Sequence, residues 1–134
     1  MTAPELQSLL NGTFPDAPPP YIVEEVADWG VRIRLPITSE HSRPGGTVAG
    51  PAVMAMADAA AWLAILAQIG PVVLAVTTSL YIDFLRKPDL VDLVADGRLL
   101  KLGKQLGVVD VGVRSSGRDE LVAKAQVTYS IPPR

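Results

Sequence analysis

Apolar and polar residues alternate along several short runs of the chain. Between residues 31 and 37, apolar side chains alternate with Arg32 and Arg34, which is typical of a strand with one solvated face. Turn residues separate this run from a strand-like run before it. In the second half of the chain, turn residues separate four further strand-like runs. The pattern predicts six strands, over residues 21–27, 31–37, 72–85, 90–102, 107–114 and 121–131.

One long run, residues 51–67, has no polar face. Every residue in it except Asp58 is apolar or proline. Pro51 fits the first position of a helix, where its missing N–H costs nothing. We predict a helix from Pro51 to Gln68, with Gly70-Pro71 as its stop.

The order of these elements indicates an α+β fold. Consecutive strands joined by short turns favour an antiparallel sheet, and one long helix must then cover one face of it. Because the helix is apolar all round, one sheet covers only part of it, which predicts a homo-oligomer. We expect one domain over residues 1–134, in which residues 1–19 form a short helix, stopped by Asn11-Gly12, and a proline-rich connector.

Composition excludes several classes of function. The 134 residues contain no cysteine, which excludes disulfides, a thiol nucleophile and thiolate metal sites, and His41 alone cannot make a multi-histidine metal site. The formal net charge of −2 gives no global electrostatic reason to expect nucleic acid. No signal-peptide pattern precedes the first helix, and a membrane span would carry Asp58 into lipid. We therefore expect a cytoplasmic protein that uses no metal or organic cofactor.

Asp58 is the first candidate for chemistry. A lone carboxylate in an apolar helix is costly to bury, so it either takes up a proton more readily or finds hydrogen-bond donors elsewhere in the fold. Carboxylates in such surroundings serve as acids and bases in active sites, although structural carboxylates share the same surroundings. The plain alternative is a helix with one wet edge, where Asp58 faces a loop or a subunit boundary.

Several stretches of the sequence resemble a known family. They are Gly46-Thr47-Val48-Ala49-Gly50-Pro51 with Met56-Ala57-Asp58 behind it, then residues 75–88, 97–104 and 122–129. In this order and spacing they resemble the hotdog-fold acyl-CoA thioesterases of the phenylacetyl-CoA thioesterase type. The resemblance implies a hotdog fold, which is an antiparallel six-stranded sheet wrapped around one long central helix. It also implies dimers, often paired into tetramers, with active sites at the dimer interface.

The resemblance also assigns roles near the start of the helix. In the family, Gly-Thr-x-His-Gly-Gly precedes the helix and a catalytic Asp or Glu follows nine residues after the His. Here Ala49 takes the His position, Gly50 takes that of the first Gly, and Asp58 takes that of the catalytic carboxylate. Arg43 stands where many relatives carry Asn. These two departures leave open an altered substrate range, a slow enzyme, or a domain that only binds acyl-CoA.

Thioester hydrolysis needs an activated nucleophile and a stabilised oxyanion. Asp58 can act as general base or as nucleophile, and the backbone N–H of Gly50 at the helix N-terminus can hold the oxyanion. The two are about 12 Å apart along the helix axis, so we expect Asp58 of one subunit to approach Gly50 of the other. Candidate substrate-binding residues are cations and hydroxyls near strand ends, although exposure explains each cation equally well: Arg43, Thr77, Thr78, Arg86, Lys87, Lys101 and Lys104.

The sequence therefore predicts an acyl-CoA thioesterase and leaves two rivals. One is a non-catalytic domain that binds acyl-CoA, which the absent His and Asn favour. The other is a dehydratase relative on the same fold, which would need His41 as its base although His41 lies well before the helix. We interpret His41 as a loop residue, and Trp62 as packing or as part of an acyl pocket.

Overall fold

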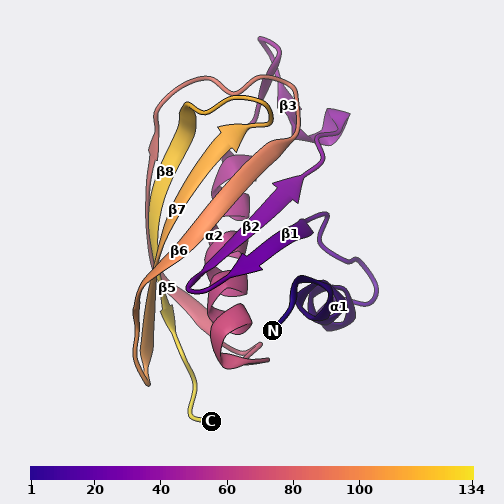
Figure 1. The fold of residues 1–134 in the computed structure, drawn as a ribbon. Coiled ribbons are helices and arrows are strands. Elements are labelled where there is room, and N and C mark those ends of the chain that lie inside the picture. The colour runs from indigo at the N-terminus through magenta and orange to yellow at the C-terminus, as the bar shows by residue number, and fades with distance from the viewer.

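The computed structural model describes residues 1–134 as a curved sheet packed against one long helix (Figure 1). The elements are α1 (Ala3–Thr13), β1 (Ile22–Ala27), β2 (Gly30–Leu35), a 3₁₀ turn η1 (Ser39–His41), β3 (Ser42–Arg43), β4 (Thr47–Val48), α2 (Gly50–Ile69), β5 (Val76–Phe84), β6 (Leu93–Leu102), β7 (Leu106–Ser115) and β8 (Leu121–Ser130).

The six long strands form one antiparallel sheet in the order β1-β2-β6-β7-β8-β5. This confirms the predicted hotdog architecture, with six strands and one long central helix. Strands β1 and β5 are the two edges, and β3 with β4 forms a separate small hairpin just before α2. The chain therefore enters α2 from a hairpin and leaves it toward β5, at an open edge of the sheet.

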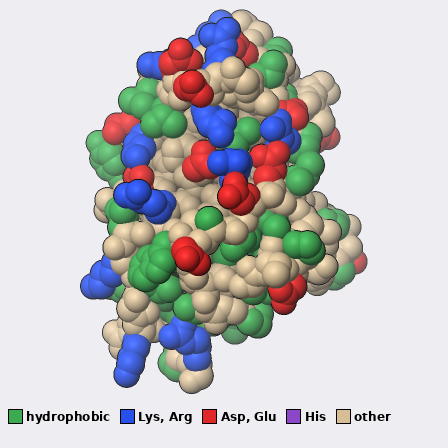
Figure 2. All heavy atoms as spheres, viewed as in Figure 1, with side chains coloured by type: hydrophobic (Ala, Val, Ile, Leu, Met, Phe, Trp, Pro, Cys, Tyr) green, Lys and Arg blue, Asp and Glu red, His purple; other side chains and the backbone are tan.

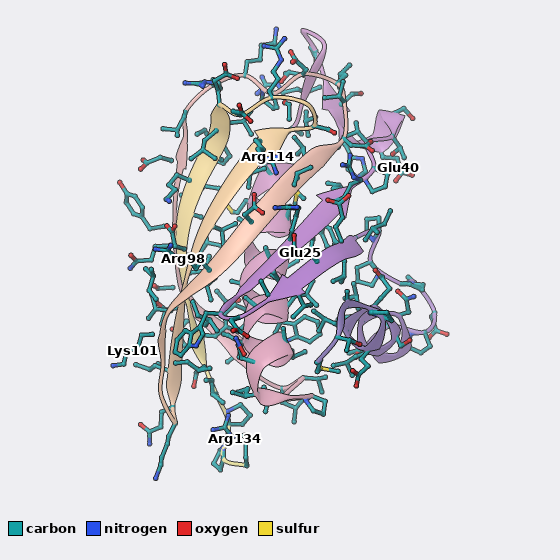
Figure 3. The ribbon with its side chains drawn as sticks, viewed as in Figure 1. Glu25, Glu40, Arg98, Lys101, Arg114 and Arg134 are labelled. Atoms are coloured by element: carbon teal, nitrogen blue, oxygen red, sulfur yellow. The ribbon has the colours of Figure 1, made fainter.

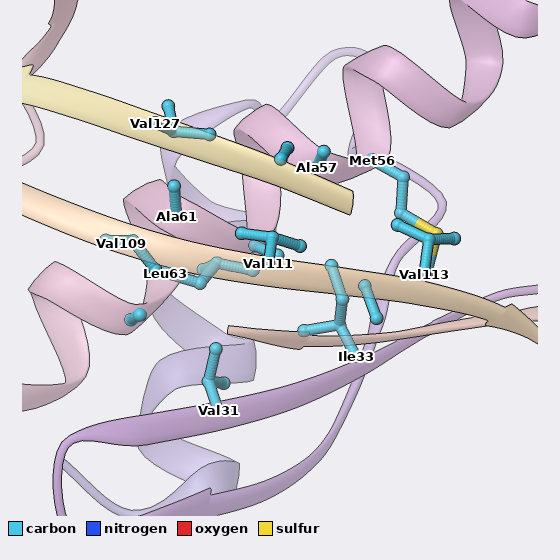
Figure 4. Packing of buried hydrophobic residues seen from close by; sticks show 14 of the residues in the cluster. Val31, Ile33, Met56, Ala57, Ala61, Leu63, Val109, Val111, Val113 and Val127 are labelled. Atoms are coloured by element: carbon cyan, nitrogen blue, oxygen red, sulfur yellow. The ribbon is translucent and has the colours of Figure 1, made fainter. Parts of the chain in front are cut away.

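Small residues bring α2 close to the sheet. Ala57, Ala60, Ala61 and Ala64 are fully buried, and a Cβ added to Gly97 in β6 would lie only 3.2 Å from the carbonyl oxygen of Ala60. Figure 4 shows Ala57 and Ala61, with Met56 and Leu63 of the same helix, meeting inward-facing valines of β2, β7 and β8. The helix backbone thus rests almost directly on the strands, which fixes the positions of its remaining side chains.

One stripe of α2 is left uncovered by the sheet. Met54, Ala55, Asp58 and Trp62 follow helical spacing along it, and Met54 is 41% exposed. By length and composition the helix is apolar enough to cross a membrane, but 56% of its most apolar 18-residue segment is buried inside the protein. It is therefore the core helix of the domain.

The outer face of the sheet carries charges of both signs. Figure 2 shows lysine, arginine and acidic side chains interspersed across it. Many are paired: Arg32 lies 3.0 Å from Asp96 and 3.1 Å from Glu25, and Lys124 lies 2.7 Å from Asp110. Figure 3 shows Glu25 and Arg114 on the same region of this face. Pairs of this kind leave no large field of one sign on the side shown.

Strand β5 forms an open and partly apolar edge. It pairs with β8 on one side only, and Val76, Tyr81 and Phe84 are 59%, 67% and 52% exposed. An edge with free backbone groups and exposed apolar side chains is a template for pairing with another chain. This edge continues onto the uncovered stripe of α2.

Several predicted boundaries were wrong. The first helix continues past Asn11-Gly12 to Thr13, where the Thr13 hydroxyl donates to the carbonyl of Leu9 at 2.7 Å. Helix α2 begins at Gly50, so Pro51 is its second residue. The strand predicted over residues 72–85 is β5, and it starts only at Val76. Backbone hydrogen bonds hold residues 70–75 in turns before it.

Candidate active site

The carboxylate of Asp58 accepts hydrogen bonds from two hydroxyl groups of the sheet. The Thr77 hydroxyl donates to its Oδ1 at 2.7 Å, and the Tyr129 hydroxyl lies 2.8 Å from the same atom. Tyr129 also lies 3.1 Å from the backbone carbonyl of Asp58. Of the two expectations for this carboxylate, hydrogen bonding elsewhere in the fold is the one observed.

The strands aim both donors at α2. In β8 the inward residues alternate with outward ones and end at Tyr129, which is 4% exposed. In β5 the pairing register slips between Thr77 and Ser79, so Thr77 and Leu80 both face the helix side. A bulge re-aims the side chain beside it. Thr78, the extra residue, instead donates to the carbonyl of Thr128 at 3.2 Å.

Asp58 lines a largely apolar cavity of about 440 Å³. Its walls come from α1, the connector to β1, α2, the segment between α2 and β5, and the strands β5 and β8. The rings of Phe14 and Trp62 meet at an angle of 60°, with centroids 6.3 Å apart. The cavity is therefore suited to an apolar group held beside a carboxylate. Its lining residues are Leu10, Phe14, Pro19, Tyr21, Ala55, Asp58, Ala59, Trp62, Val73, Ala75, Val76, Thr77 and Tyr129.

No lysine, arginine or histidine lines this cavity. Its other titratable groups are two phenols. Burial raises the pKa of Tyr129, the nearby Thr77 hydroxyl partly offsets this, and the negative charge of Asp58 raises it further. Burial and then the charge of Asp58 raise the pKa of Tyr21. Both phenols therefore keep their protons at neutral pH.

A second cavity, of about 590 Å³, surrounds the start of α2. Gly50 is the first residue of the helix, so its N–H has no acceptor inside the helix, and no side chain or loop carbonyl of the chain accepts from it. The ring of Phe84 lies beside it, 3.7 Å from where a Cβ on Gly50 would stand. A free backbone donor thus faces this cavity at the positive end of the helix dipole.

Three cations line the Gly50 cavity. They are Arg43 from β3 and the pair Arg86 and Lys87 just after β5. None of them has a carboxylate within 4.0 Å among the ion pairs of the chain. Unpaired cations around a free backbone N–H make this cavity suited to an anion.

Lys101 and Lys104 lie elsewhere. Lys101 is in β6, on the end of the sheet near Arg134 (Figure 3), whereas the β3 hairpin that carries Arg43 lies at the opposite end (Figure 1). Lys104 lines a separate cavity with the C-terminal residues Pro132 and Arg134. Of the seven residues predicted to bind substrate, Arg43, Arg86 and Lys87 lie at the Gly50 cavity and Thr77 lies at Asp58. Lys101 and Lys104 lie at the far end of the sheet, and Thr78 lines neither cavity.

Sequence reasoning gave Tyr129, Tyr21 and Phe14 no role. Tyr129 could have been found, because the inward positions of its strand are Ala123, Ala125, Val127 and Tyr129, and only the last carries a polar group. Phe14 gave no signal, since it follows a helix that was predicted to end earlier. His41, predicted to lie in a loop, is the last residue of the 3₁₀ turn η1, and its ring accepts from the backbone N–H of Thr38 at 3.0 Å.

A sequence model described as the thioesterase superfamily matches residues 45–122, which is more than half of the chain. The chain belongs to the thioesterase superfamily. The matched segment includes Gly50, Asp58 and Thr77, and it ends before Tyr129. The superfamily assignment agrees with the fold.

Individual relatives agree. A candidate thioesterase from Silicibacter sp. TM1040 is 40% identical, with a TM-score of 0.89 over 98% of this chain and 92% of that one. A candidate esterase from Thermoplasma acidophilum is 27% identical over 109 residues, which is 81% of each chain. Zebra fish thioesterase superfamily member 2 is 18% identical, with a TM-score of 0.84 over 98% and 99% of the two chains, and shows the shared fold alone.

Proposed function

We propose that the protein hydrolyses acyl- or aryl-CoA thioesters, as a cytoplasmic homodimer or dimer of dimers. The observation that supports this most is the division of the site into two incomplete halves. The Asp58 cavity offers a carboxylate and apolar walls but no cation, and the Gly50 cavity offers cations and a free N–H but no carboxylate. A CoA thioester needs all of these at once, because it joins an apolar acyl group to a phosphorylated carrier.

A two-fold dimer through the β5 edge would bring the halves together. Antiparallel pairing of two β5 strands around their middle residue, Leu80, sets the Val76 end of one against the Phe84 end of the other. Thr77 and Asp58 lie at the first end, and Phe84 and Gly50 lie at the second. Each dimer then contains two composite sites, each with a carboxylate from one subunit and an N–H from the other.

The chemistry in such a site is general-base hydrolysis. Asp58 takes a proton from water while the water oxygen bonds to the thioester carbon, and the carbonyl electrons move to an oxygen held by Gly50 N–H of the partner subunit. The tetrahedral species collapses, the C–S bond breaks, and the thiolate of CoA receives the proton from Asp58. Attack by the carboxylate itself, giving an anhydride that water then opens, uses the same groups.

The cations of the Gly50 cavity would hold the phosphates of CoA. Arg86 and Lys87 follow β5 directly, and Arg43 faces them from the β3 hairpin. Arginine binds phosphate through its planar fork and lysine as a point charge. The apolar cavity at Asp58 would hold the acyl group, beside the rings of Phe14 and Trp62.

Mixing two inactive variants tests the composite site. Asp58→Asn and Gly50→Pro each damage one half, and random exchange of subunits makes half of the dimers mixed. A mixed dimer has one site with both halves intact, so about one quarter of wild-type turnover should return. Thiol release from several acyl-CoAs measures this. Turnover that stays at the level of the separate variants, or a stable monomer in sedimentation at micromolar concentration, would refute a site shared between subunits.

A domain that binds acyl-CoA without cleaving it is the second candidate. Ala49 has no imidazole, and Arg43 is too long and too cationic to replace an Asn in kind. Binding of a non-hydrolysable acyl-CoA analogue by wild-type protein that releases no thiol from any acyl-CoA would establish this function.

A further inference from the structure

The two oxygens of the Asp58 carboxylate are not equivalent. Thr77 and Tyr129 both reach Oδ1, at 2.7 and 2.8 Å, and no group of the chain donates to Oδ2. A carboxylate can accept about four hydrogen bonds, spread over its two oxygens. Here both donors from the sheet meet one oxygen, although they come from different strands.

Counting protons shows that Oδ1 is occupied. Tyr129 has one hydroxyl proton and two acceptors in reach, Oδ1 at 2.8 Å and the Asp58 carbonyl at 3.1 Å. The carboxylate oxygen is the nearer and the charged one, and hydrogen bonds to charged acceptors are the stronger. The carbonyl of Asp58 is also placed to accept within α2, so the phenol is free to donate to Oδ1.

The surroundings keep these donors in place. Tyr129 is buried and has a raised pKa, so it remains a phenol. The titratable groups facing Asp58 inside the subunit are Tyr129 from β8 and Tyr21 from the connector before β1. In the proposed dimer, Arg43, Arg86 and Lys87 of the partner subunit approach from the remaining side. Within the subunit, neutral hydroxyls alone stabilise the carboxylate charge.

We propose that Tyr129 and Thr77 are positioning residues that occupy Oδ1 of Asp58 and leave Oδ2 as the oxygen that reacts. The inference rests on the proposed hydrolysis and deepens it. Oδ2 takes the proton from the attacking water and later returns it to the thiolate, while Oδ1 keeps its two hydrogen bonds throughout. The same division holds if Oδ2 attacks the thioester carbon directly.

Tyr129→Phe is the first test, with Thr128→Val as the control that removes a hydroxyl from the outer face of the same strand. Loss of one donor makes the negative carboxylate less favourable, so the acid limb of the kcat/KM profile should move to higher pH, by about one unit. Turnover at neutral pH should fall about tenfold, because the carboxylate is less well oriented. Thr128→Val should leave both unchanged. An acid limb that coincides with wild type in folded Tyr129→Phe overturns the inference.

Thr77→Val is the second test, and it keeps the inference open to refutation if Tyr129→Phe does not fold. Thr77 is exposed in the subunit, so folding should survive, and the acid limb should again move upward. Thr77→Ser keeps the hydroxyl and should restore the wild-type profile. A Thr77→Val profile equal to that of wild type contradicts the role given to Thr77. Asp58→Asn separates the two ideas: if it retains near-normal turnover, the proposed hydrolysis fails, whereas an inactive Asp58→Asn with unshifted donor variants sinks only this inference.

Discussion

The two cavities at the uncovered side of α2 are opposites. The one at Asp58 has apolar walls, three hydroxyl-bearing neighbours and one carboxylate, and the one at Gly50 has a free backbone donor and unpaired cations. The first can hold an acyl group and move a proton, and the second can hold phosphates and a developing negative charge. Neither cavity can carry out the reaction alone. The difference supports the proposal that the subunit is half of the functional unit, and it is a stronger reason to propose a dimer than exposed apolar area.

The largest effect is expected at the proton-moving half. Asp58→Asn keeps the size of the side chain and an acceptor for Thr77 and Tyr129, but it cannot take a proton from water. Turnover should fall by about two orders of magnitude or more, since acid–base catalysis contributes roughly 10²–10⁴. The melting temperature should stay close to that of wild type. Measuring both on one preparation decides the role: near-normal turnover with lower stability would make Asp58 structural.

The next effect is expected at the anion-holding half. Gly50→Pro removes the backbone N–H and adds a ring beside Phe84. Proline suits the start of a helix, and Ala49 before it already has the extended backbone that proline requires, with ψ of 140°. Turnover should fall about 100-fold, as for loss of one oxyanion donor. Gly50→Ala keeps the N–H, and its Cβ would meet Phe84 only at 3.7 Å. Equal losses in the two variants would mean that the donor is not used.

The smallest effect is expected from the cations. Arg86→Ala and Lys87→Ala should raise KM for acyl-CoA a few-fold and change kcat little, because phosphate contacts are remote from the bond that breaks. Lys101→Ala and Lys104→Ala, which lie away from the Gly50 cavity, should have the weaker effect. An acyl-pantetheine without the nucleotide should abolish the difference between Arg86→Ala and wild type. The same loss with both substrates would place Arg86 outside the CoA path.

The sequence predicted α2 to within one residue at each end because its signals are local. A proline lies near the start of a run with no polar face, and a Gly-Pro pair follows the end of that run. Asp58 was conspicuous for the same reason. The inward and outward faces of β2 could also be predicted, because arginines alternate with apolar residues along this strand.

The partners of Asp58 depend on information that is not local. Tyr129 lies 71 positions further along the chain, and only the pairing of β7 with β8 and of β8 with β5 brings it under α2. Thr77 reaches the carboxylate because β5 contains a bulge between Thr77 and Ser79. The Thr-Thr-Ser sequence does not indicate whether a bulge is present, so the direction of the Thr77 side chain could not be predicted. Register between distant strands is set by their packing, so the sequence could name the acid and not its donors.

The position of α2 in the chain has a consequence for how the protein is made. The helix ends at Ile69, and the strands that cover it are β6, β7 and β8, the last of which ends at Ser130. At roughly 5–20 residues per second, a ribosome needs several seconds to synthesise that covering after the helix has been translated. During this time the most apolar segment of the chain has only β1, β2 and α1 beside it. We therefore expect the nascent chain to need protection by chaperones, and its yield in a cell to depend on temperature and translation speed more than the stability of the finished protein suggests.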